Sequence, residues 1–148
     1  MLGIGQSSDQ HTPKRIEFFD DIRVRNVSCG GWHTVVVAES GDCYAFGRGE
    51  YGRLGLGDTK SRTRPHLVKA LKGKSVVHAA CGGSHTLFVT NDGTAFVAGR
   101  SDHGRLGLVD MKSLAIPTRL DLGPITILQV SAGASPALNR VIDKQNMD

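Results

Sequence analysis

The sequence predicts an all-β protein built from β-propeller blades, with two complete four-stranded repeats and a partial third. Three observations predict this incomplete propeller. Glycine-rich motifs recur at a fixed step of 52 residues, and short β-prone runs separated by turn residues fill each repeat. No stretch of a dozen residues has helical periodicity. A fixed period of about fifty residues is typical of stacked supersecondary units, and short strands favour a propeller blade over a leucine-rich or helical repeat.

The repeat extends along most of the chain. The loop GRGEYGRLGLGD at 47–58 returns as GRSDHGRLGLVD at 99–110, and three prolines keep the same step, namely Pro13, Pro65 and Pro117. The motif CGGWHT at 29–34 returns as CGGSHT at 81–86. We therefore divide the chain into repeat 1 (1–53), repeat 2 (54–105) and a partial, degenerate repeat 3 (106–148).

Each strand follows from local signals. In repeat 2 we expect strands at 66–69, 75–80, 86–90 and 94–98, with Asn91-Asp92-Gly93 as the hairpin turn between the last two. Glu39-Ser40-Gly41 marks the matching turn in repeat 1. In repeat 3, residues 125–131 still predict a strand, but Pro136 stands where His85 predicts a histidine. This decay, together with a start inside the motif, predicts a fragment of a longer propeller.

Composition adds few constraints. Eighteen lysines and arginines against fourteen acidic residues give a net charge of +4, which suits an acidic partner and equally suits an ordinary soluble surface. The longest apolar run, at 35–38, is too short to span a bilayer, so we expect no membrane insertion. Three cysteines without zinc spacing predict reduced thiols and a cytoplasmic or nuclear location.

Taken together, the motifs resemble the repeat of the regulator of chromosome condensation family. The resemblance rests on LGLGD, a following proline, CGGxHT, the Asp-Gly hairpin and GRxxxGR, and it covers nearly the whole chain. It implies a seven-bladed β-propeller, of which this chain holds about three repeats. Relatives use this fold as a docking platform in HECT-type ubiquitin ligases, mitotic kinases and ciliary scaffolds.

Arginines stand where the family more often has asparagine or glutamine, and two interpretations stay open. In the first, each guanidinium pairs with a nearby carboxylate and ties neighbouring blades together. The candidate carboxylates are Glu50, Asp58, Asp102 and Asp110. In the second, equivalent arginines of successive blades form a basic arc that binds an acidic partner. The arginines concerned are Arg48, Arg53, Arg100 and Arg105, with Arg62 and Arg64 as an extension of the arc.

Other conspicuous residues are interpreted as structural. His33 and His85 occupy equivalent places in different blades, so we expect them to fix turns, and no metal or cofactor is expected. The paired glycines (Gly30, Gly31, Gly82 and Gly83) are expected at turns, with positive φ at the second glycine of each pair. Trp32 is either a packing residue or an exposed partner contact. A lone tryptophan cannot form the light-sensing cluster of one plant relative.

The sequence predicts a non-enzymatic protein-interaction module, because it contains no nucleophile elbow, phosphate-binding loop or zinc signature. The expected partner is a protein, with a small GTPase, chromatin and a ubiquitin-pathway component as candidates. The alternative is part of a guanine nucleotide exchange factor for a small GTPase of the Ran type, with chromatin binding. The preserved 52-residue step leaves no room in the first two repeats for an inserted wedge loop. Open blade edges predict self-association.

Overall fold

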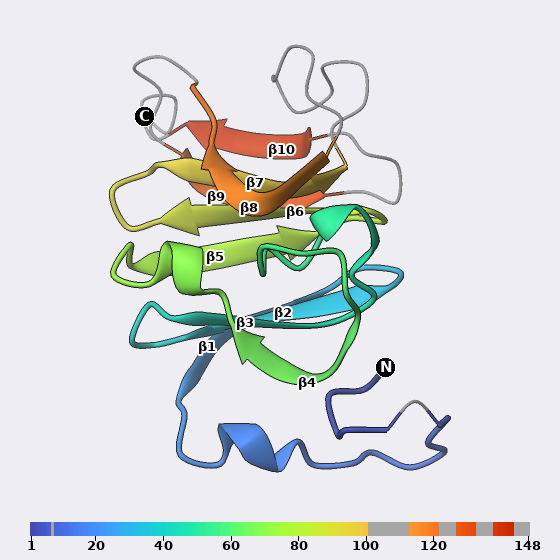
Figure 1. The fold of residues 1–148 in the computed structure, drawn as a ribbon. Coiled ribbons are helices and arrows are strands. Elements are labelled where there is room, and N and C mark those ends of the chain that lie inside the picture. The colour runs from blue at the N-terminus through green and yellow to red at the C-terminus, as the bar shows by residue number, and fades with distance from the viewer. Residues whose placement is uncertain (7, 101–112, 122–126, 133–137, 144–148) are drawn as a thin grey trace.

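The computed structural model describes residues 1–6, 8–100, 113–121, 127–132 and 138–143. The described strands form three antiparallel sheets that lie one above another in chain order (Figure 1). The first sheet contains β1 (Val24–Cys29), β2 (His33–Ala38), β3 (Cys43–Gly47) and β4 (Arg62–Leu67). The second contains β5 (Val76–Cys81), β6 (His85–Thr90), β7 (Ala95–Arg100) and β8 (Ser113–Arg119). The third pairs β9 (Ile127–Ala132) with β10 (Leu138–Asp143).

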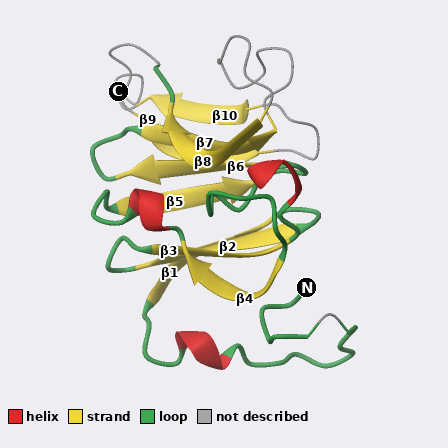
Figure 2. Ribbon diagram, in the orientation of Figure 1, coloured by secondary structure: helices red, strands yellow, loops and turns green. Residues whose placement is uncertain are grey.

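The first two sheets have the same topology and register. Strand order follows the chain in both, and His33 faces Gly47 across the first sheet as His85 faces Gly99 across the second. Only three single-turn 3-10 helices, η1 (Glu17–Phe19), η2 (Glu50–Gly52) and η3 (Lys69–Leu71), interrupt the strands and loops of the described residues (Figure 2). The prediction of all-β blades in an incomplete propeller is therefore confirmed.

The sheets are offset from the sequence repeats by one strand. The first strand expected in repeat 2 is β4, which pairs with β3 and so becomes the outermost strand of the first sheet. It begins earlier than expected, at Arg62, and ends before η3. Each repeat therefore supplies the outer strand of one blade and the three inner strands of the next.

One of two core clusters in the described residues lies between the first two sheets. Val35 and Val37 of β2 pack with Val76 and Phe88 of the second sheet, and Leu54 and Leu71 from the connecting segments complete the cluster. Every residue of β6 is buried, its polar residues included, because Phe88 packs in this cluster while Leu87 and Val89 pack in a second one. Among the described helices, none has the length and apolar character needed to cross a bilayer.

Gly30 is needed because the two sheets approach closely at its position. A Cβ atom at Gly30 would lie 2.2 Å from the carbonyl oxygen of Gly82, on the second sheet's side of the interface. A Cβ atom at Gly31 would have no neighbour within 4 Å. Neither Gly31 nor Gly83 has a positive φ, so the prediction of left-handed backbone there is wrong. The first glycine of the pair, not the second, is sterically required.

We predict opposite outcomes for substitutions at the two neighbouring glycines. Gly30→Ala should lower the free energy of unfolding by about 1–3 kcal/mol, because the new methyl group forces the sheets apart. Gly31→Ala is the matched control and should stay within about 0.5 kcal/mol of the wild type. Chemical denaturation of both variants measures the difference, and equal stability of the two would refute the close approach.

Candidate functional site

The recurrent glycine-rich loop joins neighbouring blades. Residues 48–57, called the clamp loop below, leave β3 and dock on β8 of the next sheet. The amide of Gly57 donates to the carbonyl of Ala115 at 2.9 Å, and a Cβ atom on Gly52 would lie 2.4 Å from the Ala115 Cα. An equivalent bond 52 residues earlier runs from the amide of Gly5 to the carbonyl of Thr63 at 2.9 Å. The described residues thus show the same backbone bond at two successive outer strands, β4 and β8.

Arg53 lies inside this junction. Its side chain is only 3% exposed, and Nη1 donates to the carbonyl of Gly83 at 2.8 Å while Nε donates to the carbonyl of Glu50 at 2.9 Å. Burial lowers the pKa of the Arg53 guanidinium from its ordinary value. Arg53 ties two blades together through backbone carbonyls rather than a carboxylate. The prediction that placed Arg53 in an exposed basic arc is wrong, because the side chain does not reach solvent.

A buried hydrogen-bond chain continues from Arg53 to the first sheet. The hydroxyl of Thr86 donates to the carbonyl of Arg53 at 2.6 Å, so its oxygen accepts from Nε2 of His33, also at 2.6 Å. This direction puts the His33 proton on Nε2 and leaves Nδ1 bare. Burial, with help from the charge of Arg53, lowers the pKa of His33 to about 3. His33 is therefore neutral and positions the second sheet.

His85 holds the equivalent position in the second sheet. It is fully buried, burial lowers its pKa, and neither ring nitrogen has a hydrogen-bond partner in the described part of the chain. Within those residues, no three histidine, cysteine or acidic side chains come together as a metal site would require. His33, by contrast, bonds to a threonine hydroxyl of the next sheet. Its buried side chain therefore has a role in the blade junction.

Side chains of β1 bind the backbone of β5 at the same junction. Asn26 Oδ1 accepts from the amide of Ala79 at 3.1 Å, and Ser28 Oγ accepts from the amide of Cys81 at 2.9 Å. The thiol of Cys81 donates to the carbonyl of Ser28 at 3.3 Å. These bonds satisfy backbone groups that the β5–β6 ladder leaves unpaired, so the innermost strands of successive blades are joined directly.

An exposed surface of aromatic and arginine side chains lies at the end of this junction that holds the β1–β2 turn. Trp32 is 59% exposed, and the Arg48 guanidinium carbon lies 5.0 Å from the centre of its ring. Arg48 also pairs with the Glu50 carboxylate at 2.7 Å. Tyr51 is 41% exposed, and the Arg100 guanidinium carbon lies 5.2 Å from its ring centre. We call Trp32, Arg48, Tyr51 and Arg100 the aromatic–arginine patch. The β1–β2 turn, which carries Trp32, and η2, which carries Tyr51, lie at the same end of the sheets (Figure 1).

Tyr51 is held in an unusual conformation. Its φ of 64° is in the left-handed region that residues other than glycine rarely adopt. The amide of Gly52 donates to the carbonyl of Gly49 at 3.0 Å and closes the turn around it. Residues in such conformations often lie at functional sites, where the surrounding structure compensates the strain. Sequence analysis missed Tyr51, although an aromatic residue inside the recurrent arginine loop is a usable signal.

The remaining arginines separate into distinct environments. Arg62 pairs with Asp58 at 2.8 Å within one blade, and this bond lowers the pKa of the Asp58 carboxyl. Arg64 is exposed on the same strand, β4. Arg105, Asp102 and Asp110 lie outside the described residues. The structure thus places Arg48 against Trp32 and Arg100 against Tyr51, with Arg62 and Arg64 on the outer strand.

Comparison with known proteins identifies the family. A profile of the Regulator of chromosome condensation (RCC1) repeat matches residues 1–37 and 40–89, and a second RCC1 repeat profile matches residues 24–53 and 76–105. The chain belongs to the RCC1 repeat family. The resemblance that the sequence motifs indicated is confirmed.

Individual RCC1-repeat relatives are much longer than this chain. The Ultraviolet-B receptor UVR8 of Arabidopsis thaliana is 39% identical over 89% of this chain and 30% of its own length. Human E3 ubiquitin-protein ligase HERC2 is 38% identical over 90% of this chain and 3% of its own length. This chain therefore spans less than a third of either relative.

Solved structures confirm the fold. Human WBSCR16 superposes with a TM-score of 0.70 at 28% identity, covering 75% of this chain and 29% of that structure. Saccharomyces cerevisiae Prp20p superposes with a TM-score of 0.67 at 21% identity, covering 77% of this chain and 30% of that structure. The two complete sheets are blades of an RCC1-like propeller.

We predict that the two arginines of the clamp loop differ in their contribution to stability. Arg53→Met should lower the free energy of unfolding by about 1–3 kcal/mol, because the carbonyls of Glu50 and Gly83 lose their buried donor. Arg48→Met removes an exposed ion pair and should cost less than about 1 kcal/mol. Urea unfolding of both variants tests this, and an equal or larger loss for Arg48→Met would contradict the buried tie.

A second prediction concerns pH. The unfolded chain protonates His33 near its ordinary value of about 6.5, whereas the folded protein keeps the pKa at about 3. The contribution of His33 to the free energy of unfolding is therefore fully present above pH 6.5. It declines as the pH falls towards 3, by at most about 1.4 kcal/mol per pH unit.

His33→Gln isolates this contribution. Its amide still donates to Thr86 but does not titrate, so the variant should lose less stability than the wild type between pH 7 and 5.5. Carboxylates remain ionised over most of this window and contribute little. Urea unfolding at the two pH values gives the comparison, and identical losses in both proteins would exclude His33 as the titrating group.

Proposed function

We propose that this chain is part of a non-enzymatic RCC1-type propeller that binds a protein partner through the aromatic–arginine patch. The observation that carries the proposal is Trp32, a large apolar side chain that stays mostly exposed with an arginine stacked on it. Tryptophan, tyrosine and arginine are the residues most enriched at the energetic centres of protein interfaces. The patch contains all three.

The patch is held in place before any partner arrives. Arg48 is fixed on one side by Glu50 and on the other by Trp32. Tyr51 is fixed by its turn and by Arg53, whose guanidinium carbon lies 5.8 Å from the Tyr51 ring centre and is anchored in the blade junction. Ordered side chains lose little conformational entropy on binding, which favours affinity. The chemistry fits a partner surface with an apolar pocket for Trp32 and an acidic group near Arg48.

The relatives support a protein partner without naming one for this chain. HERC2 is named as a ubiquitin-protein ligase, and the Prp20p structure is described with its binding to Gsp1p and histones. The likeness to Prp20p, at 21% identity, supports the fold alone. A ubiquitin-pathway component, a small GTPase and chromatin stay as candidate partners. Guanine nucleotide exchange stays the alternative, which a nucleotide-release assay with a Ran-type GTPase tests.

Self-association through open blade edges also stays a prediction. Val24 and Val27 of β1, the edge strand of the first sheet, are exposed apolar side chains. Sedimentation across a concentration series tests whether these edges recruit a second copy.

We predict that single substitutions in the patch weaken partner binding while the fold is retained. A partner recovered with the wild-type chain would be purified and its affinity measured by calorimetry. Trp32→Ala and Arg48→Ala should each weaken binding about tenfold or more, which corresponds to about 1.4 kcal/mol. Arg25→Ala, an exposed arginine on β1, is the control and should bind normally. Unchanged affinity of the Trp32 and Arg48 variants would remove the patch as the binding site.

A further inference from the structure

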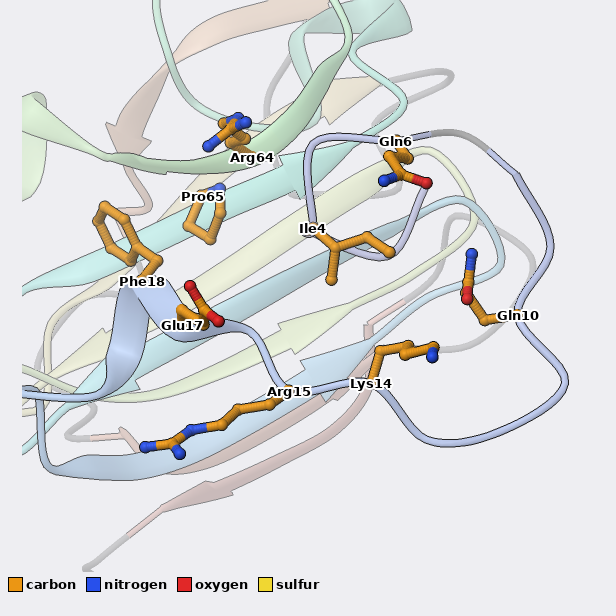
Figure 3. Close-up of a pocket in the computed structure, with 10 residues that line it drawn as sticks. Ile4, Gln6, Gln10, Lys14, Arg15, Glu17, Phe18, Arg64 and Pro65 are labelled. Carbon is orange, nitrogen blue, oxygen red and sulfur yellow. The ribbon is translucent and has the colours of Figure 1, made fainter.

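Two grooves open along the outer strands of the blades, and none of their lining residues belongs to the aromatic–arginine patch. The first has a volume of about 590 Å³ and lies between the N-terminal segment and β4 (Figure 3). The second has a volume of about 350 Å³ and lies between β4 with η3 and residue Ile116 of β8. Strand β4 is thus a wall of both grooves.

The two grooves are equivalent features of successive repeats. Residues that line the first groove have counterparts 52 positions later that line the second, for example Gln10 and Arg62, Lys14 and His66, and Arg64 and Ile116. The walls are fixed by the equivalent backbone bonds from Gly5 to Thr63 and from Gly57 to Ala115. In both described cases, a groove forms where a glycine-rich turn crosses an outer strand.

Both grooves carry excess positive charge. The first is lined by Lys14, Arg15 and Arg64 against the single acidic residue Glu17. Arg15 pairs with Asp20 at 2.8 Å, whereas Arg64 has no carboxylate partner within the described residues and lies against Gly5. In the second groove, Arg62 and Lys69 are cationic and no lining residue is acidic, but Arg62 pairs with Asp58 beside the groove. An anionic ligand would neutralise Lys14, Arg64 and Lys69, for which the described residues show no ion pair.

The walls also include apolar surface. Leu56 and Ile116 line the second groove, and Ile116 is 58% exposed. Phosphate groups gain nothing from such a wall, but apolar side chains of a peptide do. A peptide cannot easily pair with β4 as an added β-strand, because Pro65 has no N–H and the carbonyl of Thr63 already accepts from the amide of Gly5. Recognition therefore depends on side chains.

We propose that the two grooves bind an extended acidic peptide segment of a partner protein, with carboxylates against Lys14 and Arg64 and an apolar residue against Leu56 and Ile116. One continuous segment crosses β4 and occupies both grooves. The site is separate from the aromatic–arginine patch, so the same chain engages a partner at two surfaces.

Fluorescence polarisation with a short fluorescein-labelled peptide rich in glutamate and leucine tests the proposal. The wild-type chain should bind it, with affinity that falls as salt rises. The double variant Lys14→Glu, Arg64→Glu should bind about tenfold more weakly or worse. The matched control Arg25→Glu, Lys74→Glu has the same net charge and changes two exposed residues outside the grooves, so it should bind like the wild type.

Additional variants and a second probe distinguish a peptide ligand from a nucleic acid and control for loss of folding. Lys14→Gln, Arg64→Gln should show an intermediate loss with an unchanged thermal melt. Ile116→Ser should weaken the peptide but not a labelled single-stranded oligonucleotide. Trp32→Ala should leave peptide binding intact, which separates this site from the patch. Equal peptide binding by the wild type and the groove variant would overturn the proposal, as would an oligonucleotide that binds as tightly as the peptide.

Discussion

The buried chain of Arg53, Thr86 and His33 is the interaction on which the arrangement of the blades depends. Arg53 donates to Gly83 of the next sheet, accepts from Thr86 through its own carbonyl, and Thr86 in turn accepts from His33 of the first sheet. Each sheet supplies polar groups that the other satisfies in a site without solvent. Sliding one sheet past the other would leave buried donors and acceptors unpaired, at a cost of about 1–3 kcal/mol each.

The exposed patch is a consequence of this buried chain. Arg53 holds the carbonyl of Glu50 from inside, so the Glu50 carboxylate stays outside to pair with Arg48, which stacks on Trp32. The same turn places Tyr51 at a positive φ with its ring near both Arg53 and Arg100. The two arginines of one loop thus have different roles, one in the blade junction and one at the surface.

Local signals were sufficient to predict the blades, but not their junctions. Hairpin turns, glycine spacing and β-prone runs are short-range properties, so strands such as β6 and β7 were predicted close to their observed positions. The pairing of β4 with β3 is a long-range choice, and the sequence repeat does not show it.

Arg48 and Arg53 have the same side chain within one loop, and only docking of that loop on β8 separates them. Gly30 and Gly31 are likewise distinguished only by the approach of Gly82. The sequence shows a threonine after each of His33 and His85. The role of Thr86 could not be predicted from it, because its hydroxyl bonds to residues of both blades.

Native-state hydrogen exchange tests most directly whether this chain makes the first two blades one cooperative unit. Amides of β2 in the first sheet and β6 in the second would be followed in the wild type and in Thr86→Val, which keeps the shape and removes the hydroxyl. We predict one shared opening free energy for both strands in the wild type and a lower, separate value for β6 in the variant. Different opening free energies for β2 and β6 in the wild type, or an unaffected β6 in Thr86→Val, would contradict the account.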